Sequence, residues 1–178
     1  MHTITDETYF ITTTVTDWID VFTRPAYKDI VVDSLRYCQR NKGLKVYAWV
    51  LMTNHLHIIA SATQNCTLTD IMRDFKKFTA KRLLTEIANN QQESRSEWML
   101  RRFGFAGANR KEPGSFCLWQ QGYHPELLHS RDFYLQKLNY IHNNPVKQAI
   151  VAQPEHYLYS SAIDYAGGKG LLDVTIIT

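Results

Sequence analysis

The stretch from Lys45 to Ala60 constrains the fold of this chain more than any other. It is apolar and rich in β-branched and aromatic residues, a composition that is typical of β-strands. Thr53-Asn54 interrupts it with a tight connection. We therefore predict two antiparallel strands that form a hairpin, one over Leu44–Met52 and one from His55 to Ala60 or slightly beyond.

Two histidines in the second strand of this hairpin are candidate metal ligands. Side chains alternate between the faces of a strand, so His55 and His57 point to one face and Leu56 points to the other. Two imidazoles a few ångströms apart on a rigid sheet form half of a metal site. The pattern also has an ordinary explanation, because any strand with scattered histidines produces it.

Size and charge set the broad class of the protein. The chain has 178 residues and a formal net charge of +3, which fits one domain over 1–178. We place its core at about 9–150 and treat 151–178 as a C-terminal extension. The charge permits a nucleic-acid partner without requiring one. No run approaches the ~18 apolar residues of a membrane span, so no membrane partner is expected.

The cysteines and the N-terminal residues indicate the compartment. Cys38, Cys66 and Cys117 are odd in number and far apart, which matches neither a disulfide framework nor a zinc knuckle. The first residues lack the basic start and the apolar stretch of a signal peptide. We therefore expect a cytoplasmic protein with three buried or incidental thiols.

Three helices and a first strand are expected around the hairpin. Tyr9–Thr16 is rich in β-branched and aromatic residues and predicts a strand. One helix begins at Pro25 and ends at about Asn41, and a second follows the capping residue Thr67. A third runs from Ser130 to Asn144, because Pro145 favours an extended conformation in the residue before it.

The remaining segments are less regular. Residues 103–114 hold three glycines and a proline and predict a mobile loop. A short helix is expected within Glu155–Tyr165, and a strand or tail over Leu171–Ile177. Three roles are open for the tail after Ser161: it covers the site, pairs with another chain or pads the core. In the second helix, apolar residues at intervals of three or four predict the buried face. These residues are Leu68, Ile71, Met72, Phe75, Phe78 and Leu83.

The order of the elements predicts the fold class. With a fourth strand somewhere within 116–129, the first six elements form the βαββαβ pattern of a ferredoxin-like α+β fold. This fold has an antiparallel sheet with helices on one face, and here a C-terminal helix and tail follow it. Its first and third strands lie side by side in the centre. His55 and His57 would then lie on a central strand.

A basic cluster in the second helix is a candidate DNA-binding surface. Lysines and arginines fall mostly between the apolar positions, on the outer face, where they can follow a phosphate backbone. The residues are Arg73, Lys76, Lys77 and Lys81. An ordinary solvated helix face is the alternative. Trp119 and Tyr123 are candidates for stacking on unpaired bases, but Trp119 suits the core better.

The third helix carries the groups that complement the two histidines. Tyr140 and Asn144 are four residues apart and share one helix face. Asn144 offers an amide oxygen, which suits a hard divalent ion, and Tyr140 offers a phenol. Two imidazoles and one amide oxygen favour Mg²⁺ or Mn²⁺ over structural zinc.

Four sequence blocks in order resemble the REP-associated tyrosine transposases, domesticated relatives of the single-tyrosine HUH transposases of IS200-like insertion sequences. The blocks are Tyr47-Ala-Trp-Val-Leu-Met-Thr-Asn-His-Leu-His57, Phe75-Lys-Lys-Phe78, Leu118-Trp-Gln-Gln-Gly-Tyr123 and Tyr140-Ile-His-Asn-Asn-Pro-Val-Lys147. The resemblance spans about residues 9–161. Two departures touch no chemical group: Thr53 replaces a usual proline, and Gln148-Ala149-Ile150 lacks a usual glycine.

This resemblance implies a function and a role for each candidate residue. His55 and His57 would be the HUH histidines, Asn144 the third metal ligand and Tyr140 the nucleophile. The protein would be a metal-dependent transposase or endonuclease that cleaves and rejoins single-stranded or hairpin, REP-like DNA. The reaction would proceed through a 5′-phosphotyrosine intermediate. The family includes enzymes that act as monomers and others that act as homodimers.

Two other functions remain open. A domesticated protein can bind hairpin or single-stranded DNA with little or no cleavage, although a pure binder need not keep all four candidate site residues. A metal-dependent hydrolase that forms no covalent adduct is less consistent with the sequence, because no carboxylate is obviously placed to activate water.

Overall fold

The computed structural model describes residues 7–63, 66–108 and 115–177, and its centre is a four-stranded sheet. The strands are β1 (Tyr9–Thr14), β2 (Leu44–Leu51), β3 (His55–Ala62) and β4 (Glu126–Leu127). Each strand pairs antiparallel with its neighbours in the order β2-β3-β1-β4. The predicted central pair of first and third strands is therefore present, and the ferredoxin-like α+β fold is confirmed.

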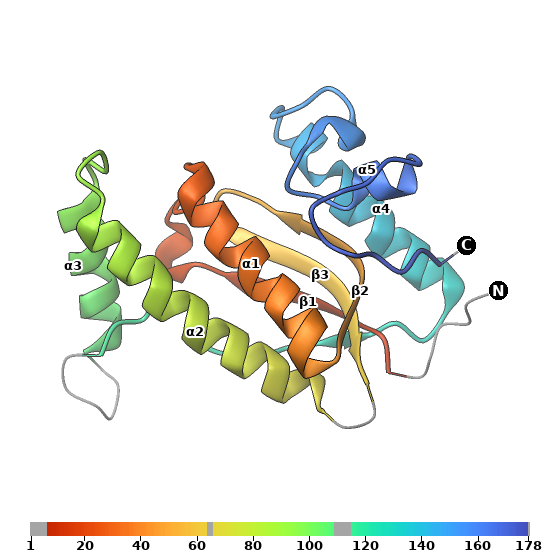
Figure 1. Ribbon diagram of the computed structural model, residues 1–178, viewed down its shortest axis with the longest axis horizontal. Coiled ribbons are helices and arrows are strands. Elements are labelled where there is room, and N and C mark those ends of the chain that lie inside the picture. Colours follow the sequence, from red (N-terminus) through yellow and green to blue (C-terminus); the bar gives the residue numbers. More distant parts are fainter. Residues whose placement is uncertain (1–6, 64–65, 109–114, 178) are drawn as a thin grey trace.

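Helices α1 (Pro25–Lys42) and α2 (Leu68–Asn89) lie next to each other on one face of the sheet (Figure 1). Pro25 suits the start of α1, because its φ is already helical. The N–H that proline lacks would have no helical acceptor at this position. Gly43 ends α1 with a φ of +72°, where a side chain would be strained. Thr67 caps α2 by accepting a hydrogen bond from the Asp70 N–H. These boundaries match the predicted ones.

The buried face of α2 differs from the predicted one at Phe78, whose side chain is 51% exposed. Thr79 takes the inward position instead and is fully buried. Its hydroxyl donates to the Phe75 carbonyl and accepts from the indole N–H of Trp119. Trp119 is buried and belongs to the core, which is the second of the two roles considered for it.

Helix α4 (Arg131–Lys147) packs against β2 and β3 on the opposite face of the sheet (Figure 1). Ser130 caps it by accepting from the Phe133 N–H, as predicted. The predicted end near Asn144 is wrong, because the helix continues through Pro145 to Lys147. Pro145 lies in the last turn, where its missing N–H removes only one helical hydrogen bond.

A helix replaces part of the predicted loop over 103–114. Helix α3 (Ser96–Gly107) includes the first five of those residues, and 109–114 lie outside the described residues. Met99, Phe103 and Gly107 are buried and four residues apart, so they form one inward stripe that outweighs the glycine content. A Cβ on Gly107 would collide with the Ser115 carbonyl, so glycine allows the returning chain to pass close to the helix.

The C-terminal segment covers the outer edge of β2. It contains the 3-10 turn η2 (Pro154–His156) and the four-residue helix α5 (Ala162–Tyr165) rather than one short helix. The Leu51 N–H donates to the Tyr159 carbonyl, and the Thr175 N–H donates to the Val46 carbonyl. These bonds occupy groups that an open strand edge would offer to other chains.

The last residues form no regular strand and pad the core. Leu172 and Ile177 are buried in it, and the side chains of Arg36 and Gln39 on α1 donate to the carbonyls of Leu171 and Asp173. Within the described ranges, no helix is both long and apolar enough to cross a membrane.

Candidate active site

Strand β3 and helix α4 bring three of the predicted site residues together. The imidazole rings of His55 and His57 lie with their centroids 4.6 Å apart. The Tyr140 hydroxyl lies 3.4 Å from Nε2 of His57, and the two ring centroids are 5.1 Å apart. Tyr140 is 41% exposed, so the phenol is open to a large substrate. All three groups belong to the same chain.

Asn54 determines which ring nitrogen of His55 carries the proton. Its amide nitrogen donates to the Trp18 carbonyl at 3.1 Å and to a carboxylate oxygen of Asp20 at 3.0 Å. Two acceptors on one side orient the amide, so its oxygen faces Nδ1 of His55 at 2.7 Å. That oxygen only accepts hydrogen bonds, which means that Nδ1 carries the proton and the lone pair lies on Nε2.

The acceptors for Asn54 come from the turn that follows β1. The first strand ends at Thr14 rather than at the predicted Thr16, and a 3-10 turn, η1 (Thr16–Trp18), follows it. Asp17 and Trp18 in this turn have φ values of 55° and 52°, an uncommon conformation for residues other than glycine. This backbone directs the Trp18 carbonyl toward the amide of Asn54.

Thr12 on the neighbouring strand orients the second histidine. Its hydroxyl lies 2.8 Å from Nδ1 of His57, at the position that pairs with His57 across the sheet. Burial, His55 and the charge of Lys137 lower the pKa of His57 to about 3, and burial also lowers the pKa of His55. Both imidazoles are therefore neutral near neutral pH, the form that binds metal ions.

The ring of Phe10 and two lysines lie around the pair formed by His57 and Tyr140. The Phe10 ring stacks on His57 with centroids 5.4 Å apart and meets Tyr140 edge-on at 6.1 Å. Lys137 Nζ lies 4.3 Å from the centroid of the Phe10 ring and 2.8 Å from a Glu126 carboxylate oxygen. Lys147 Nζ lies 5.6 Å from the centroid of the Tyr140 ring. The cation of Lys147 next to the exposed phenol favours an anionic substrate.

Asn144 lies one helical turn beyond Tyr140 and is buried. Its side-chain oxygen accepts a hydrogen bond from the Gln148 amide at 3.4 Å. Among the described residues, no hydrogen bond joins Asn144 to either histidine, and no group of three or more His, Cys, Asp or Glu side chains is arranged to hold a metal ion. A metal ion at this site would therefore depend on imidazole and amide donors.

The predicted DNA-binding residues lie on α2, on the opposite face of the sheet from Tyr140 (Figure 1). Arg73 is engaged with Asp70 and Asp74, at 2.6 and 3.2 Å. Lys76 Nζ donates to the carbonyls of Gln120 and Gly122. The other two, Lys77 and Lys81, are exposed. The structure does not bring these four residues to the histidines, and their role stays a prediction.

Sequence reasoning missed the residues that support the site. Asn54 was read only as part of a turn, and Thr12 only as part of a strand. The predicted pairing of the first and third strands is a signal for Thr12, because a hydroxyl directly across from His57 can reach its ring. Lys137 precedes Tyr140 by three residues on the same helix, a spacing that places both on one face.

Comparison with known proteins places the chain in a family. No curated protein matches it. Its fold is similar to a structure described as the REP-associated tyrosine transposase bound to a REP hairpin, with a TM-score of 0.64, 18% identity, and coverage of 100% of this chain and 91% of that chain. A candidate transposase from Deinococcus radiodurans R1 has a TM-score of 0.45 and 19% identity, over 80% of this chain and 94% of that chain.

The model of a family described as IS200-like transposases matches residues 5–106, more than half of the 178 residues. The chain therefore belongs to the IS200-like transposase family, as its motifs predicted.

Proposed function

We propose that this transposase is a metal-dependent, single-tyrosine transesterase that cleaves and rejoins single-stranded or hairpin DNA. The observation that carries the proposal is the position of Tyr140, whose hydroxyl lies 3.4 Å from Nε2 of His57 and whose ring lies beside Lys147. A phenol with these neighbours is suited to attack a phosphate ester. The similar structure described with a bound REP hairpin supports hairpin DNA as the substrate.

The donor set fits Mg²⁺ or Mn²⁺. His55 and His57 would hold the ion through Nε2, because the partners of Nδ1 are Asn54 and Thr12. Asn144 would supply an amide oxygen, which has a second lone pair besides the one that accepts from Gln148. The amide oxygen suits these hard ions, and both imidazoles are already neutral and bind without losing a proton. When bound, the ion supplies Lewis-acid stabilisation of the charge that develops on the scissile phosphate.

The residues of the chain supply the remaining chemistry. The phenol oxygen of Tyr140 forms a bond to phosphorus and gives its proton to solvent. The bond from phosphorus to the 3′ oxygen breaks, and that oxygen takes a proton from solvent. The products are a 5′-phosphotyrosine and a free 3′-hydroxyl. One phosphate ester replaces another, so no ATP is needed, and attack by a second 3′-hydroxyl reverses the reaction. Tyrosine suits this role because a phenolate leaves more readily than an alkoxide.

The site needs only one chain to bring Tyr140 and His57 together. This contact supports a protein that can cut DNA as a monomer. Lys137 and Lys147 would place positive charge beside the phosphate as the phenol attacks.

The test is formation of a covalent protein–DNA adduct. The chain is incubated with Mn²⁺ and a labelled pool of hairpins with randomised single-stranded flanks, then separated under denaturing conditions. The unmodified chain should form an adduct that EDTA prevents. The variant His57→Ala should bind the hairpins but form far less adduct. Tight binding by the unmodified chain without any adduct would contradict the enzyme and favour a DNA-binding protein that does not cleave.

A further inference from the structure

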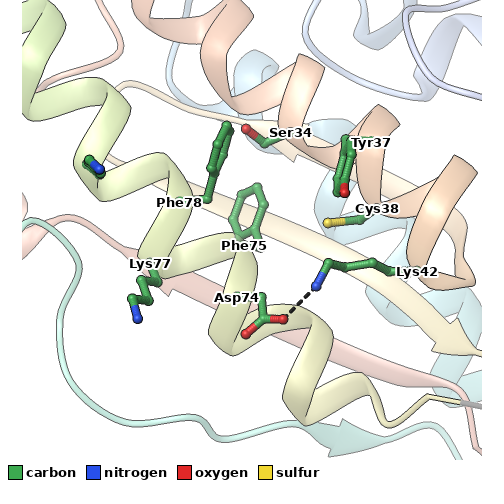
Figure 2. Close-up of a pocket in the computed structure, with 9 residues that line it drawn as sticks. Ser34, Tyr37, Cys38, Lys42, Asp74, Phe75, Lys77 and Phe78 are labelled. Carbon is green, nitrogen blue, oxygen red and sulfur yellow. Dashed lines mark hydrogen bonds and ion pairs between the residues drawn. The ribbon is translucent and has the colours of Figure 1, made fainter.

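A cleft of about 510 Å³ lies between α1 and α2, on the opposite face of the sheet from Tyr140 (Figures 1 and 2). Figure 2 shows Tyr37 on α1 and Phe78 on α2 standing on facing sides of it. Phe75 lies between them at the base and is buried. An ion pair of 2.6 Å between Lys42 and Asp74 closes one end. The volume falls within the range of small-molecule sites.

The two aromatic walls are unusual because both are open to solvent. Tyr37 is 57% exposed and Phe78 is 51% exposed, although each borders the apolar base of the cleft. Polar groups of the lining are engaged within the protein: the Ser34 hydroxyl donates to the Ile30 carbonyl, and Asp74 pairs with Lys42. The cleft therefore offers flat aromatic surfaces more than directed hydrogen bonds, which favours a planar ligand held by stacking.

Positive charge lies along the α2 side of the cleft. Lys77 and Lys81 border it, and they also border a second hollow of about 440 Å³ on the other side of α2. The guanidinium of Arg82 lies 5.8 Å from the centroid of the Phe78 ring. A ligand that carries planar groups on an anionic backbone matches both the walls and the rim. Single-stranded DNA has this chemistry, since every base has a π face and every linkage a charge.

The second hollow lies near the end of the sheet that carries His55. Trp119 and Gln120 line it, and the Gln120 N–H donates to the Thr14 carbonyl at 2.8 Å. Thr14 pairs with His55 across the central strands. Lys77 and Lys81 border both hollows, and Gln120 in the second hollow bonds to Thr14, the strand position that pairs with His55.

We propose that the cleft between α1 and α2 binds one base of a DNA single strand, stacked between Tyr37 and Phe78 with its neighbouring phosphates on Lys77 and Lys81. The inference rests on the proposed function, because it extends the same substrate to the far face of the sheet. It assigns the exposed face of α2 a role in holding the single-stranded flank of a hairpin. Because stacking reads no base edges, the contact tolerates any base.

Photochemical crosslinking tests the position of the base directly. The protein carries Tyr140→Phe, so that no adduct at Tyr140 competes. The probe is an oligothymidylate of about 12 nucleotides, a length within the site sizes of single-strand binding folds, with one 5-iodouracil. Ultraviolet light joins this base to an aromatic ring stacked on it, and mass spectrometry of the digested protein locates the bond. We expect the crosslink at Tyr37 or Phe78. Crosslinks confined to other residues would overturn the proposal.

Binding measurements separate stacking from charge. Tyr37→Ala and Phe78→Ala should each weaken binding of the oligothymidylate about tenfold. Tyr37→Phe should bind like the parent, because the ring rather than the hydroxyl makes the contact. Phe105→Ala is the matched control, since Phe105 is an exposed aromatic residue on α3, outside the cleft. Equal affinity of Tyr37→Ala, Phe78→Ala and Phe105→Ala would contradict the proposal.

The salt dependence tests the lysines. The double substitution Lys77→Gln and Lys81→Gln should reduce the slope of log affinity against log salt by about 1.4, or about 0.7 for each phosphate contact on a single strand. Lys45→Gln, at an exposed position on β2, is the control and should leave the slope unchanged. An unchanged slope in the double variant would refute the phosphate contacts. All of these measurements use protein that carries Tyr140→Phe, so their outcome is independent of whether the chain cleaves DNA.

Discussion

The Tyr140 hydroxyl lies 3.4 Å from Nε2 of His57, although 83 residues separate the two positions in the chain. β3 places the imidazole on the face of the sheet that α4 covers, and α4 crosses that face with its tyrosine directed at the ring. The packing of one helix on a central strand therefore assembles the proposed nucleophile and a proposed metal ligand. Residues around this pair determine how well it works.

Thr12 should control the activity through His57. Thr12→Val keeps the shape of the side chain but removes the hydroxyl that lies 2.8 Å from Nδ1. The imidazole then loses the hydrogen-bond partner that holds its ring in place, so metal affinity or the rate of adduct formation should fall about 10- to 100-fold. The measurement is the initial rate of adduct formation across a Mn²⁺ titration. Thr13→Val, on the other face of β1, should show the parent rate, and equal loss in both variants would count against the orienting role.

Asn54 should act in the same way on His55. Asn54→Ala removes the acceptor for the Nδ1 proton and leaves the imidazole free to change tautomer. We expect a loss of about 10- to 100-fold in adduct formation at limiting Mn²⁺, with partial recovery at high Mn²⁺. Asp20→Asn is the control, because an amide oxygen at that position can still accept from Asn54. The interpretation fails if Asp20→Asn loses as much activity as Asn54→Ala.

Glu93 should make the stability depend on pH in the acidic range. Burial raises the pKa of this carboxyl, but hydrogen bonds from Arg95 and Arg24 outweigh burial and lower the pKa from 4.5 to about 2. A lowered pKa in the folded state means that the stabilisation is complete above pH 4.5 and is lost as the pH falls toward 2. The shift corresponds to about 3 kcal/mol.

The variant Glu93→Gln tests this stabilisation. Urea unfolding should show a free energy of unfolding about 3 kcal/mol lower than the parent at pH 7, and a much smaller difference near pH 2. Glu97→Gln removes an exposed ion pair with Arg101 and should have little effect at either pH. An equal loss for Glu93→Gln at both pH values would show that the pKa shift is not the cause.

Hydrogen bonds also connect Glu93 to the active site. Arg95, which Glu93 holds, donates to the Asp20 carbonyl at 2.9 Å. Asp20 in turn accepts from Asn54, the residue that orients His55. A loss of the buried carboxylate is therefore expected to loosen the turn after β1 as well as to destabilise the fold.

The sequence predicted the parts of the molecule that rest on local patterns. The hairpin of β2 and β3 follows from two β-branched runs around Thr53-Asn54, and the helix caps at Thr67 and Ser130 follow from side chains that satisfy free N–H groups. The central position of β3 follows from the order of the elements. The roles of Tyr140 and Asn144 rest on their spacing and on the resemblance to a family, and they stay predictions.

Other features depend on contacts that no local pattern encodes. Phe78 is exposed because Thr79 occupies the inward position of α2. The Thr79 hydroxyl accepts a hydrogen bond from Trp119, forty residues later in the chain. Helix α3 is stabilised by the burial of Met99 and Phe103, which outweighs its glycines. The orientation of Asn54 depends on backbone at Trp18 with a positive φ. Each of these requires the tertiary structure.

The most direct test of the account is the location of the covalent bond between protein and DNA. The chain is incubated with Mn²⁺ and the hairpin pool, digested with trypsin and nuclease, and examined by mass spectrometry, with Tyr140→Phe in parallel. We predict a nucleotide attached to the peptide that contains Tyr140, and no adduct in Tyr140→Phe, which should bind DNA like the parent. A nucleotide on another residue, or an undiminished adduct in Tyr140→Phe, would contradict the assignment of Tyr140 as the nucleophile.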